Sequence, residues 1–291
     1  MGLDVSIICR NFRDDRVIPR FSRYLSDYLG WNLASKPAKG FALYYLSGYF
    51  EWMLIKREFR GAKIAAYFTH REEKPVGNAK AQLFDSVAAK VDLRIATAGI
   101  YADQLVKYGD TAQIYPPVER SKFTIPNKKN KNLFAGFSGY TYPNKRKGEG
   151  LAVALVDSKI GKKVSWKASG RGWCVPTRMY PWSEMDNFYQ SLDILVITAM
   201  VEGVPMPPLE ALACGVSVVV PRGVGLLDEL PDTNGIHRYE RGNKKALVAA
   251  FQDAVEARAG VNRGDLRAVT KPYSILAWCE QHKHNFEELL S

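Results

Sequence analysis

The sequence predicts an α/β protein with two doubly wound parallel sheets, and three observations support this. Short apolar runs such as Lys63–Phe68 and Ile194–Thr198 alternate with stretches of helical period, which is the pattern of βαβ units. The 291 residues are enough for two domains. Pro116, Pro117 and the Lys-rich stretch 125–132 have the composition of a linker near the middle of the chain.

The most informative stretch is 192–221, which reads as strand, loop, helix and strand. Ile194–Thr198 is the first buried strand, and Pro207 or Pro208 fits the first turn of a helix over Leu209–Cys214. Gly215 ends that helix, and Val216–Val220 is the second strand. We therefore expect a helix N-terminus, with free N–H groups, at the carboxyl edge of a parallel sheet, where anions bind.

Two carboxylates belong to this loop and helix. Glu210 lies in the first helical turn, where the helix dipole stabilises a carboxylate. Glu202 precedes the helix and is followed by Gly203, which lets the backbone approach a ligand closely. Acidic acceptors beside N–H donors suit a ligand that carries hydroxyls and phosphate, such as a nucleotide sugar. An ordinary βαβ unit with two solvated glutamates is the alternative.

The stretch EGVPMPPLEALACGVSVVV, residues 202–220, resembles a known signature. It is similar to the E-G-x-P-x-x-x-x-E-A-x-A-x-G-x-P-V-V pattern of retaining GT-B glycosyltransferases, the glycosyl transferases group 1 family, with Ser217 in place of a proline. The resemblance implies that Glu202 lies against the donor sugar and that Glu210 holds the ribose hydroxyls. It also assigns the loop to the donor diphosphate: Gly203, Val204, Pro205 and Met206.

A basic cluster follows the first strand of the second half, which we expect at Asn132–Phe137. Lys145, Arg146 and Lys147 precede Gly148 and a helix over Leu151–Val156, an arrangement that suits a diphosphate. Lys147-Gly148 resembles the Lys-Gly pair of the family's diphosphate clamp. The family's arginine falls on Tyr140 or Tyr142, so the second positive charge must come from Lys145, Arg146 or Arg171. A solvated charge run is the alternative. The candidate diphosphate residues are Gly139, Arg146, Lys147 and Arg171.

Other elements of the second half complete the pattern. Val164–Ala168 reads as a strand, with a flexible turn over 169–172. Ser183–Leu192 reads as a helix, and the resemblance implies that the region of Tyr180 just before it lines the nucleotide base. The closing helices are expected at Lys244–Ala259 and Ser274–Leu290.

The first half reads as strands and helices in alternation, without a local signature. The resemblance implies a Gly-rich turn after the first strand, but this chain has Arg10-Asn11-Phe12-Arg13 there, so the contact made by that turn is in doubt. The expected strands are Val5–Cys9, Phe41–Tyr45, Lys63–Phe68 and Val91–Ala98, and the expected helices include Val17–Leu29, Phe50–Phe59 and Phe84–Lys90.

His70 is the one histidine that we single out. It follows the strand Lys63–Phe68 and so lies at the ligand side of a parallel sheet. The resemblance implies a histidine near the donor sugar, where it would hydrogen-bond the sugar or the acceptor hydroxyl. A helix-capping or merely exposed loop histidine is the alternative. We therefore predict Glu202 and His70 as catalytic residues.

These observations predict the GT-B fold, with two Rossmann-like domains facing a cleft. Residues 1–125 form the acceptor-side domain, residues 126–275 bind the nucleotide sugar, and residues 276–291 form a helix that packs back across the domains.

Composition narrows the function classes. The apolar content of 46% and net charge of +11 describe a folded, basic chain, whose surface attracts nucleic acid, anionic lipid or acidic glycan without choosing among them. Ordinary solubility is an equally good reading of the charge. No run is long enough to span a membrane, the N-terminus reads as a strand, and the four cysteines lack C-x-x-C spacing. We expect reduced thiols, a cytoplasmic protein (host cytoplasm if viral) and no transmembrane segment.

The predicted activity is retaining, metal-independent transfer of a sugar from a nucleotide-diphosphate sugar to an acceptor hydroxyl. Retention is implied by the resemblance alone. The chain contains no D-x-D triplet, so we predict no metal and no cofactor besides the donor substrate. Two acceptors stay open: a hydroxymethylated base in phage-type DNA, and a membrane-associated lipid or polysaccharide. A non-catalytic protein that binds nucleotide or nucleic acid is the alternative of another class.

Overall fold

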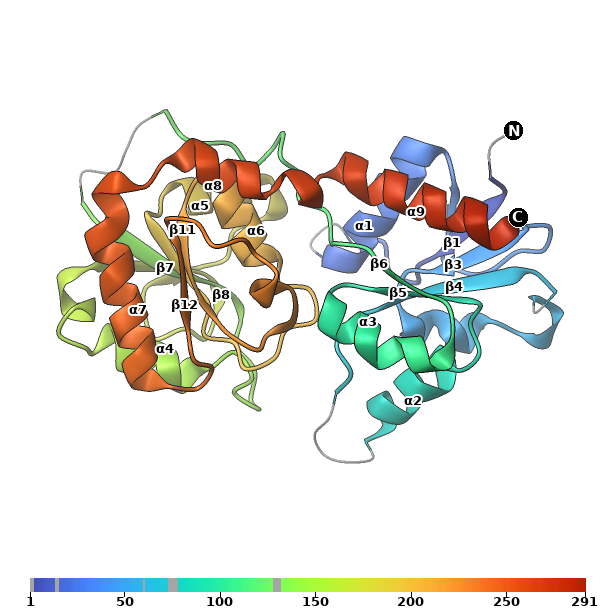
Figure 1. Ribbon diagram of the computed structural model, residues 1–291, viewed down its shortest axis with the longest axis horizontal. Coiled ribbons are helices and arrows are strands. Elements are labelled where there is room, and N and C mark those ends of the chain that lie inside the picture. Colours follow the sequence, from blue (N-terminus) through green and yellow to red (C-terminus); the bar gives the residue numbers. More distant parts are fainter. Residues whose placement is uncertain (1–2, 14–15, 60, 73–77, 128–131) are drawn as a thin grey trace. The chain divides into compact units, whose positions relative to one another are not determined.

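The computed structural model describes residues 3–13, 16–59, 61–72, 78–127 and 132–291. Within these residues the chain forms two compact units (Figure 1). Unit 1 contains residues 1–117 together with 275–291, and unit 2 contains residues 118–274. Half of the Lys-rich stretch predicted as a linker, residues 128–131, lies outside the described residues.

Unit 1 is built on a six-stranded parallel sheet with the strand order β2-β1-β3-β4-β5-β6. The four central strands are short and mainly apolar, and β3, for example, is buried along its whole length. Such strands are typical of a parallel sheet that is covered on both faces. The strands are β1 (Val5–Ile8), β2 (Asn32–Ala34), β3 (Leu43–Leu46), β4 (Lys63–Phe68), β5 (Leu93–Ala96) and β6 (Thr111–Gln113).

The helices of unit 1 match most of the predicted stretches. The predicted helix over Phe50–Phe59 is wrong: two 3₁₀ helices occupy it, because Ile55 is extended with φ −83° and ψ 99° and interrupts the helical turn. The α-helices are α1 (Val17–Leu29), α2 (Ala79–Ala88), α3 (Gly99–Leu105) and α9 (Ile275–Leu290), and the 3₁₀ helices are η1 (Tyr49–Leu54), η2 (Arg57–Phe59) and η3 (Val106–Tyr108).

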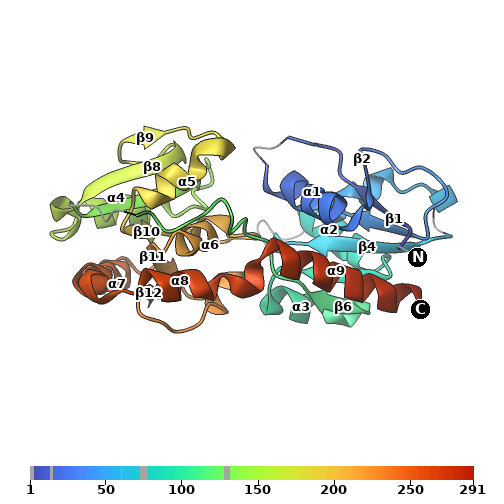
Figure 2. The same cartoon turned by 90° about the horizontal axis from the view of Figure 1, so that it is seen from above.

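Helix α9 belongs to unit 1 although it ends the chain, and it lies beside α1 (Figure 2). Its buried side chains enter an aromatic core, where Trp31 stacks on Phe286 with ring centroids 5.1 Å apart. His282 is fully buried there, and its ring nitrogens lie 2.9 Å from the Trp278 carbonyl and 3.1 Å from the Tyr45 hydroxyl. The burial lowers the pKa of His282 to about 3, so this histidine is a neutral core residue.

Unit 2 also contains a six-stranded parallel sheet, with the order β12-β11-β10-β7-β8-β9. Its strands are β7 (Phe134–Tyr140), β8 (Ser165–Arg171), β9 (Thr177–Arg178), β10 (Ile194–Val196), β11 (Ser217–Pro221) and β12 (Ile236–Tyr239). Its α-helices are α4 (Glu149–Val156), α5 (Met185–Gln190), α6 (Met206–Ala213), α7 (Lys244–Ala257) and α8 (Arg263–Val269), and its 3₁₀ helices are η4 (Gly161–Lys163), η5 (Trp182–Glu184), η6 (Gly225–Asp228), η7 (Arg258–Gly260) and η8 (Lys271–Tyr273).

The turn predicted over 169–172 is largely wrong, because β8 continues through Arg171 and pairs with β7 up to Tyr140. Gly170, which suggested the turn, instead allows the two strands to approach: a Cβ on it would lie 2.1 Å from the Gly139 carbonyl oxygen. Helix α6 begins at Met206, three residues before the predicted start, since Pro207 and Pro208 both fit its first turn.

Each sheet has a point where the strand order reverses. In unit 1, β2 lies on one side of β1 and β3 lies on the other. In unit 2, β8 and β10 lie on opposite sides of β7 in the same arrangement. Doubly wound sheets bind ligands in the crevice at the carboxyl ends of these two central strands. The fold therefore predicts ligand sites at the loops after β1 and β3 in unit 1, and at the loops after β7 and β10 in unit 2.

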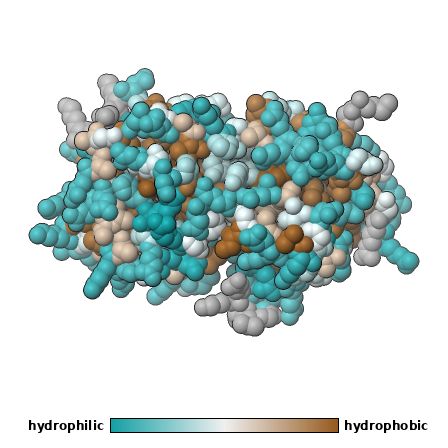
Figure 3. All heavy atoms as spheres, in the orientation of Figure 1, coloured by the Kyte–Doolittle hydropathy of each residue, from teal (hydrophilic) through white to brown (hydrophobic). Residues whose placement is uncertain are grey.

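Surface and thiol features agree with the sequence. The face shown in Figure 3 is covered mainly by hydrophilic side chains. Among the described helices, none combines the length and apolar composition needed to cross a bilayer. All four cysteines are free thiols, with Cys174 exposed and the others buried.

Candidate functional site

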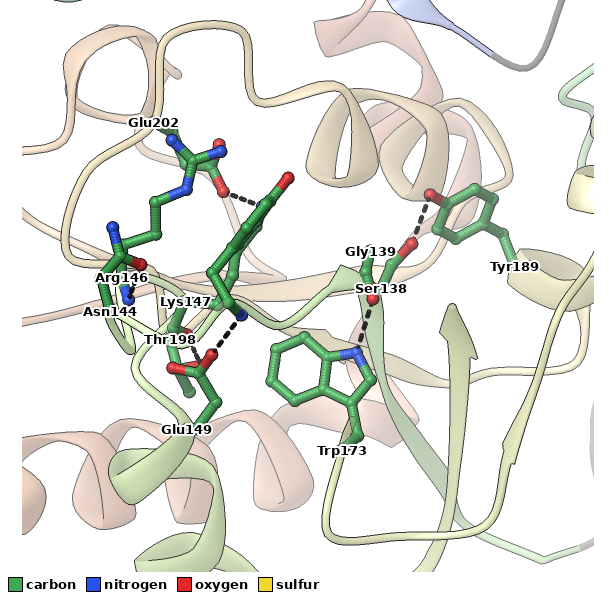
Figure 4. Close-up of polar contacts among 11 residues, drawn as sticks. Ser138, Gly139, Asn144, Arg146, Lys147, Glu149, Trp173, Tyr189, Thr198 and Glu202 are labelled. Carbon is green, nitrogen blue, oxygen red and sulfur yellow. Dashed lines mark hydrogen bonds and ion pairs between the residues drawn. The ribbon is translucent and has the colours of Figure 1, made fainter. Parts of the chain in front are cut away.

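The reversal point of unit 2 brings two loops together, the β7–α4 loop with the basic cluster and the β10–α6 loop with Glu202 (Figure 4). The Lys147 ammonium donates a hydrogen bond to Glu202 Oε1 and forms an ion pair with it. The side chains of Lys147 and Glu202 are 14% and 15% exposed, so a ligand can reach both groups. Two residues 55 positions apart in the sequence thus meet where the topology predicts a ligand.

Backbone contacts hold the two loops in place. Thr198 Oγ1 donates to the Lys147 carbonyl at 2.6 Å, and the Met200 amide donates to the Arg146 carbonyl at 2.8 Å. Gly148 has a φ of +70°, and a Cβ on it would lie 1.9 Å from the Thr198 carbonyl oxygen. Glycine is therefore required after Lys147 by the close approach of the second loop.

The basic cluster itself is tightly folded. Lys145 has a φ of 53°, a left-handed conformation that is strained for a residue with a side chain. The Lys145 amide donates to the Tyr142 carbonyl at 2.8 Å, and the Gly148 amide donates to the Lys145 carbonyl at 3.0 Å. Successive turns thus direct Arg146 and Lys147 toward the β10–α6 loop.

Trp173 also lies in this site, a position that the sequence did not predict. Its indole N–H donates to the Gly139 carbonyl at 2.8 Å, and its ring stacks on Phe137 with centroids 4.9 Å apart. A small pocket contains Trp173, Lys147 and Glu202 among its lining residues. Trp173 follows the end of β8 in an irregular loop, and no local motif marks it.

The N-terminus of α6 offers fewer N–H donors than the sequence led us to expect. Pro205, Pro207 and Pro208 have no N–H, and the Met206 amide already donates to the Val204 carbonyl at 2.9 Å. The prolines that start the helix thus remove its first donors. The expectation of free N–H groups in this turn is wrong, and positive side chains must supply more of the attraction for an anion.

Glu210 is 4% exposed and points into the packed side of α6. The Tyr189 hydroxyl donates to Glu210 Oε2 at 2.6 Å and lies 3.1 Å from Ser138 Oγ. Burial, and then the Glu210 charge, raise the pKa of Tyr189 well above its usual value, so this hydroxyl remains protonated. The carboxylate predicted to hold ribose hydroxyls is therefore part of a buried hydrogen-bonded chain.

Among the remaining predicted residues, Gly139 lies beside Lys147, since a Cβ on it would be 3.7 Å from the Lys147 Nζ, whereas Arg171 and Tyr180 contact other side chains. Arg171 ends β8, with its guanidinium 5.0 Å from the centre of the Tyr140 ring. Tyr180 follows β9 and packs against Phe188, with ring centroids 5.2 Å apart. His70 is half-buried, two residues after β4, and belongs to unit 1.

The reversal point of unit 1 holds a second ion pair, which the sequence did not suggest. Arg10 follows β1, and its Nε donates to Glu51 Oε2 at 2.5 Å. The Arg10 amide donates to the other oxygen of Glu51 at 3.2 Å. The Glu51 side chain is 3% exposed, against 44% for Arg10. This pair fixes the loop that replaces the expected Gly-rich turn.

The comparisons with known proteins agree with this architecture. Residues 174–272, within unit 2, match the family described as glycosyl transferases group 1. The matched segment includes the whole β10–α6–β11 unit with Glu202 and Glu210. No curated protein matches the sequence.

Solved structures match over nearly the whole chain at low sequence identity. Sucrose-phosphate synthase of Thermosynechococcus elongatus is 13% identical, with a TM-score of 0.78 over 99% of both chains. HepE of Anabaena, solved with UDP-glucose, is 11% identical, with a TM-score of 0.78 over 98% of this chain and 99% of that one. A glycosyltransferase of Rickettsia africae is 12% identical, with a TM-score of 0.74 over 100% and 99%.

The predicted resemblance to the group 1 family and the predicted GT-B fold class are confirmed by these matches. The protein is a glycosyltransferase of the GT-B type, which confirms the predicted enzyme class.

Proposed function

We propose that this glycosyltransferase moves a sugar from a nucleotide-diphosphate sugar to an acceptor hydroxyl, without a metal ion and with retention of anomeric configuration. The observation that carries the proposal is the contact between Lys147 and Glu202 at the reversal point of unit 2. HepE, of the same fold, was solved with UDP-glucose, which supports a nucleotide-sugar donor.

The two groups suit the two charges that develop during transfer. As the bond between the anomeric carbon and the β-phosphate oxygen breaks, the sugar becomes positive and the leaving diphosphate gains negative charge. In this proposal Lys147 stabilises the diphosphate and Glu202 contacts the sugar. Without a donor, each neutralises the other; a bound donor would give the ammonium a phosphate and the carboxylate a sugar hydroxyl.

The other predicted residues take supporting roles in this proposal. Arg146 adds positive charge beside Lys147, and Gly139 and the loop 203–206 approach the diphosphate through the backbone. Glu210 would receive the ribose and Tyr180 would flank the base, while His70 would act from unit 1 on the sugar or the acceptor hydroxyl. Arg171 stays the alternative source of the second charge.

Metal independence and retention can each be measured directly. The metal proposal rests on the absence of a D-x-D triplet from the sequence, and transfer should continue at full rate in excess EDTA. The proposal of retention rests on the family resemblance, and NMR of the product formed from an α-linked donor should show an α linkage. Loss of activity in EDTA would contradict metal independence, and a β-linked product would contradict retention.

The acceptor proposal keeps two candidates, a hydroxymethylated base in DNA and a membrane-associated lipid or polysaccharide. Unit 1 holds 18 Lys and Arg against 15 Asp and Glu, whereas unit 2 holds 23 against 15. Unit 2, which we propose binds the donor, therefore carries most of the net positive charge that would attract a polyanion. Retention of labelled duplex DNA across a salt series tests the first candidate, because binding through phosphates weakens steeply with salt. No retention at low salt would remove it.

The test of the donor site is release of nucleoside diphosphate from a panel of UDP-, GDP- and ADP-sugars. We expect the wild type to hydrolyse or transfer one of them. Glu202→Gln, which keeps the shape of the side chain, should lower that rate about 100-fold. The same variant should bind free nucleoside diphosphate at least as tightly as wild type, since Lys147 loses its competing carboxylate.

Two results would contradict the proposal. If the wild type releases no nucleoside diphosphate from any donor, the alternative of a non-catalytic binding protein is favoured. If Glu202→Gln retains the wild-type rate, Glu202 does not act on the sugar. Glu184→Gln, an exposed change of the same kind in unit 2, serves as the control and should leave the rate unchanged.

A further inference from the structure

We propose that Tyr142 is a positioning residue that holds the Arg146 guanidinium for the β-phosphate of the donor. This inference rests on the proposed function and decides among the cations that the sequence left open, Lys145, Arg146 and Arg171. It also assigns a role to a tyrosine that the proposed function does not use.

The guanidinium of Arg146 lies directly over an aromatic face. Its central carbon is 4.1 Å from the centre of the Tyr142 ring, well within cation–π range. The ring has a fixed base, because the Tyr142 amide donates to Glu149 Oε1 at 3.0 Å and its carbonyl accepts from the Lys145 amide at 2.8 Å. Stacking covers one face of the guanidinium and directs the N–H groups at its edge away from the ring, as hydrogen bonds to an anion require.

The hydrogen-bonding of Arg146 is incomplete in the protein itself. Within the described part of the chain its Nε is buried without a hydrogen-bond partner, and the residue takes part in no ion pair. Lys147, by contrast, is already paired with Glu202. A buried donor without a partner is unfavourable, and an anion between Arg146 and Lys147 would satisfy it.

The position of Arg146 relative to the two loops selects the phosphate. Its carbonyl accepts from the Met200 amide, so its backbone is tied to the loop that carries Glu202. If Glu202 meets the sugar, the nearest charged group of the donor is the β-phosphate, to which the sugar is bonded. The three prolines of the 205–208 stretch leave few amides for that phosphate. A guanidinium, which donates two parallel hydrogen bonds, replaces them.

The experiment compares nucleoside diphosphates with monophosphates, because only the diphosphate carries the group that Arg146 contacts. Wild type is titrated calorimetrically with UDP, ADP and GDP, and the tightest binder is compared with its monophosphate. Arg146→Gln should weaken the diphosphate by about tenfold to a hundredfold and the monophosphate by less than about threefold. Tyr142→Leu should weaken the diphosphate about three- to tenfold, while Tyr142→Phe, which keeps the aromatic face, should resemble wild type.

Two controls distinguish loss of the phosphate contact from a general change of charge and from loss of folding. Lys159→Gln removes one exposed charge of unit 2 and should change neither affinity. Unfolding curves of the empty variants check folding; should Arg146→Gln not fold, Arg146→Lys keeps the charge without the planar fork and should lose part of the diphosphate preference.

Several outcomes would overturn the inference. If Arg146→Gln keeps the preference for diphosphate over monophosphate, Arg146 does not contact the β-phosphate. If only Arg171→Gln loses that preference, Arg171 supplies the second positive charge. A Tyr142→Phe variant as weak as Tyr142→Leu makes the hydroxyl, not the ring face, the important group. If the wild type binds no nucleoside diphosphate, the proposed function itself fails.

Discussion

Each unit carries an ion pair at the reversal point of its sheet, and the two pairs differ in exposure. In each, a cation from the loop after one central strand pairs with a glutamate from the loop after its neighbour: Arg10 with Glu51, and Lys147 with Glu202. Glu51 is 3% exposed and also accepts the Arg10 amide, so that pair fixes a loop. Lys147 and Glu202 are exposed to a similar extent, 14% and 15%, so solvent reaches both charges of that pair. The ion pairs at the two reversal points therefore differ in exposure, and we propose only the Lys147–Glu202 pair as a binding site.

The comparison is tested most strongly by removing the cation in each unit. Lys147→Ala should lower transfer about 100- to 1,000-fold, because the leaving diphosphate loses its main charged donor. Arg10→Ala should lower transfer less than about tenfold while reducing stability. Steady-state assays of nucleoside diphosphate release measure both. Equal losses of activity in the two variants would mean that the pairs do not differ in role.

The buried histidine of unit 1 gives a pH test that involves no catalysis. Burial lowers the pKa of His282 from 6.5 to about 3. Because the unfolded chain takes up the proton first, the stability contributed by neutral His282 is fully present above pH 6.5 and is lost as pH falls toward 3. At pH 5 the loss should be about 2 kcal/mol of unfolding free energy.

Urea titrations at pH 7 and pH 5 measure this loss, and His282→Gln should be less sensitive to pH. His284→Gln is the matched control, since His284 lies on the same helix and its side chain is 69% exposed. The interpretation fails if His284→Gln changes the pH dependence and His282→Gln does not.

The smallest effect concerns Glu51. Glu51→Gln keeps an acceptor for the Arg10 amide but loses the charge, which should cost about 1–2 kcal/mol of stability. Affinity for nucleoside diphosphate should stay unchanged, as Glu51 lies in unit 1. Thermal unfolding and calorimetric titration of the same preparation measure the two effects, lower stability and unchanged nucleotide affinity. Weaker nucleotide binding at unchanged stability would assign Glu51 to the ligand site.

Much of this molecule could be predicted from local sequence. The alternation of apolar runs and helical stretches predicted the two parallel sheets, because a strand buried on both faces must be apolar along its whole length. The selection of Glu202 and Lys147 as candidate site residues had another basis. Each lies beside a glycine in a loop that follows a strand, and their types match the charges of a nucleotide sugar.

Tertiary structure decided what depends on distant partners. The pairing of β7 with β8 made residues 169–171 a strand, where the local glycines favoured a turn. Arg267 holds residues 118–127 to unit 2 by donating to the Phe123 and Arg120 carbonyls. Three aromatic residues were recognised only from tertiary contacts. Trp173 contacts Gly139, Tyr189 contacts Glu210, and Tyr142 contacts Arg146.

The sequence by itself determined the fold class and the enzyme class, and it suggested Lys147 and Glu202 as candidate donor-site residues. These follow from periodicity and side-chain chemistry, which are properties of short segments. Only the tertiary structure decided that the Arg146 guanidinium lies over the Tyr142 ring, that Glu210 is buried and that both charges of the Lys147–Glu202 pair are partly exposed. Burial and contact arise from residues far apart in the chain, and no local pattern records them.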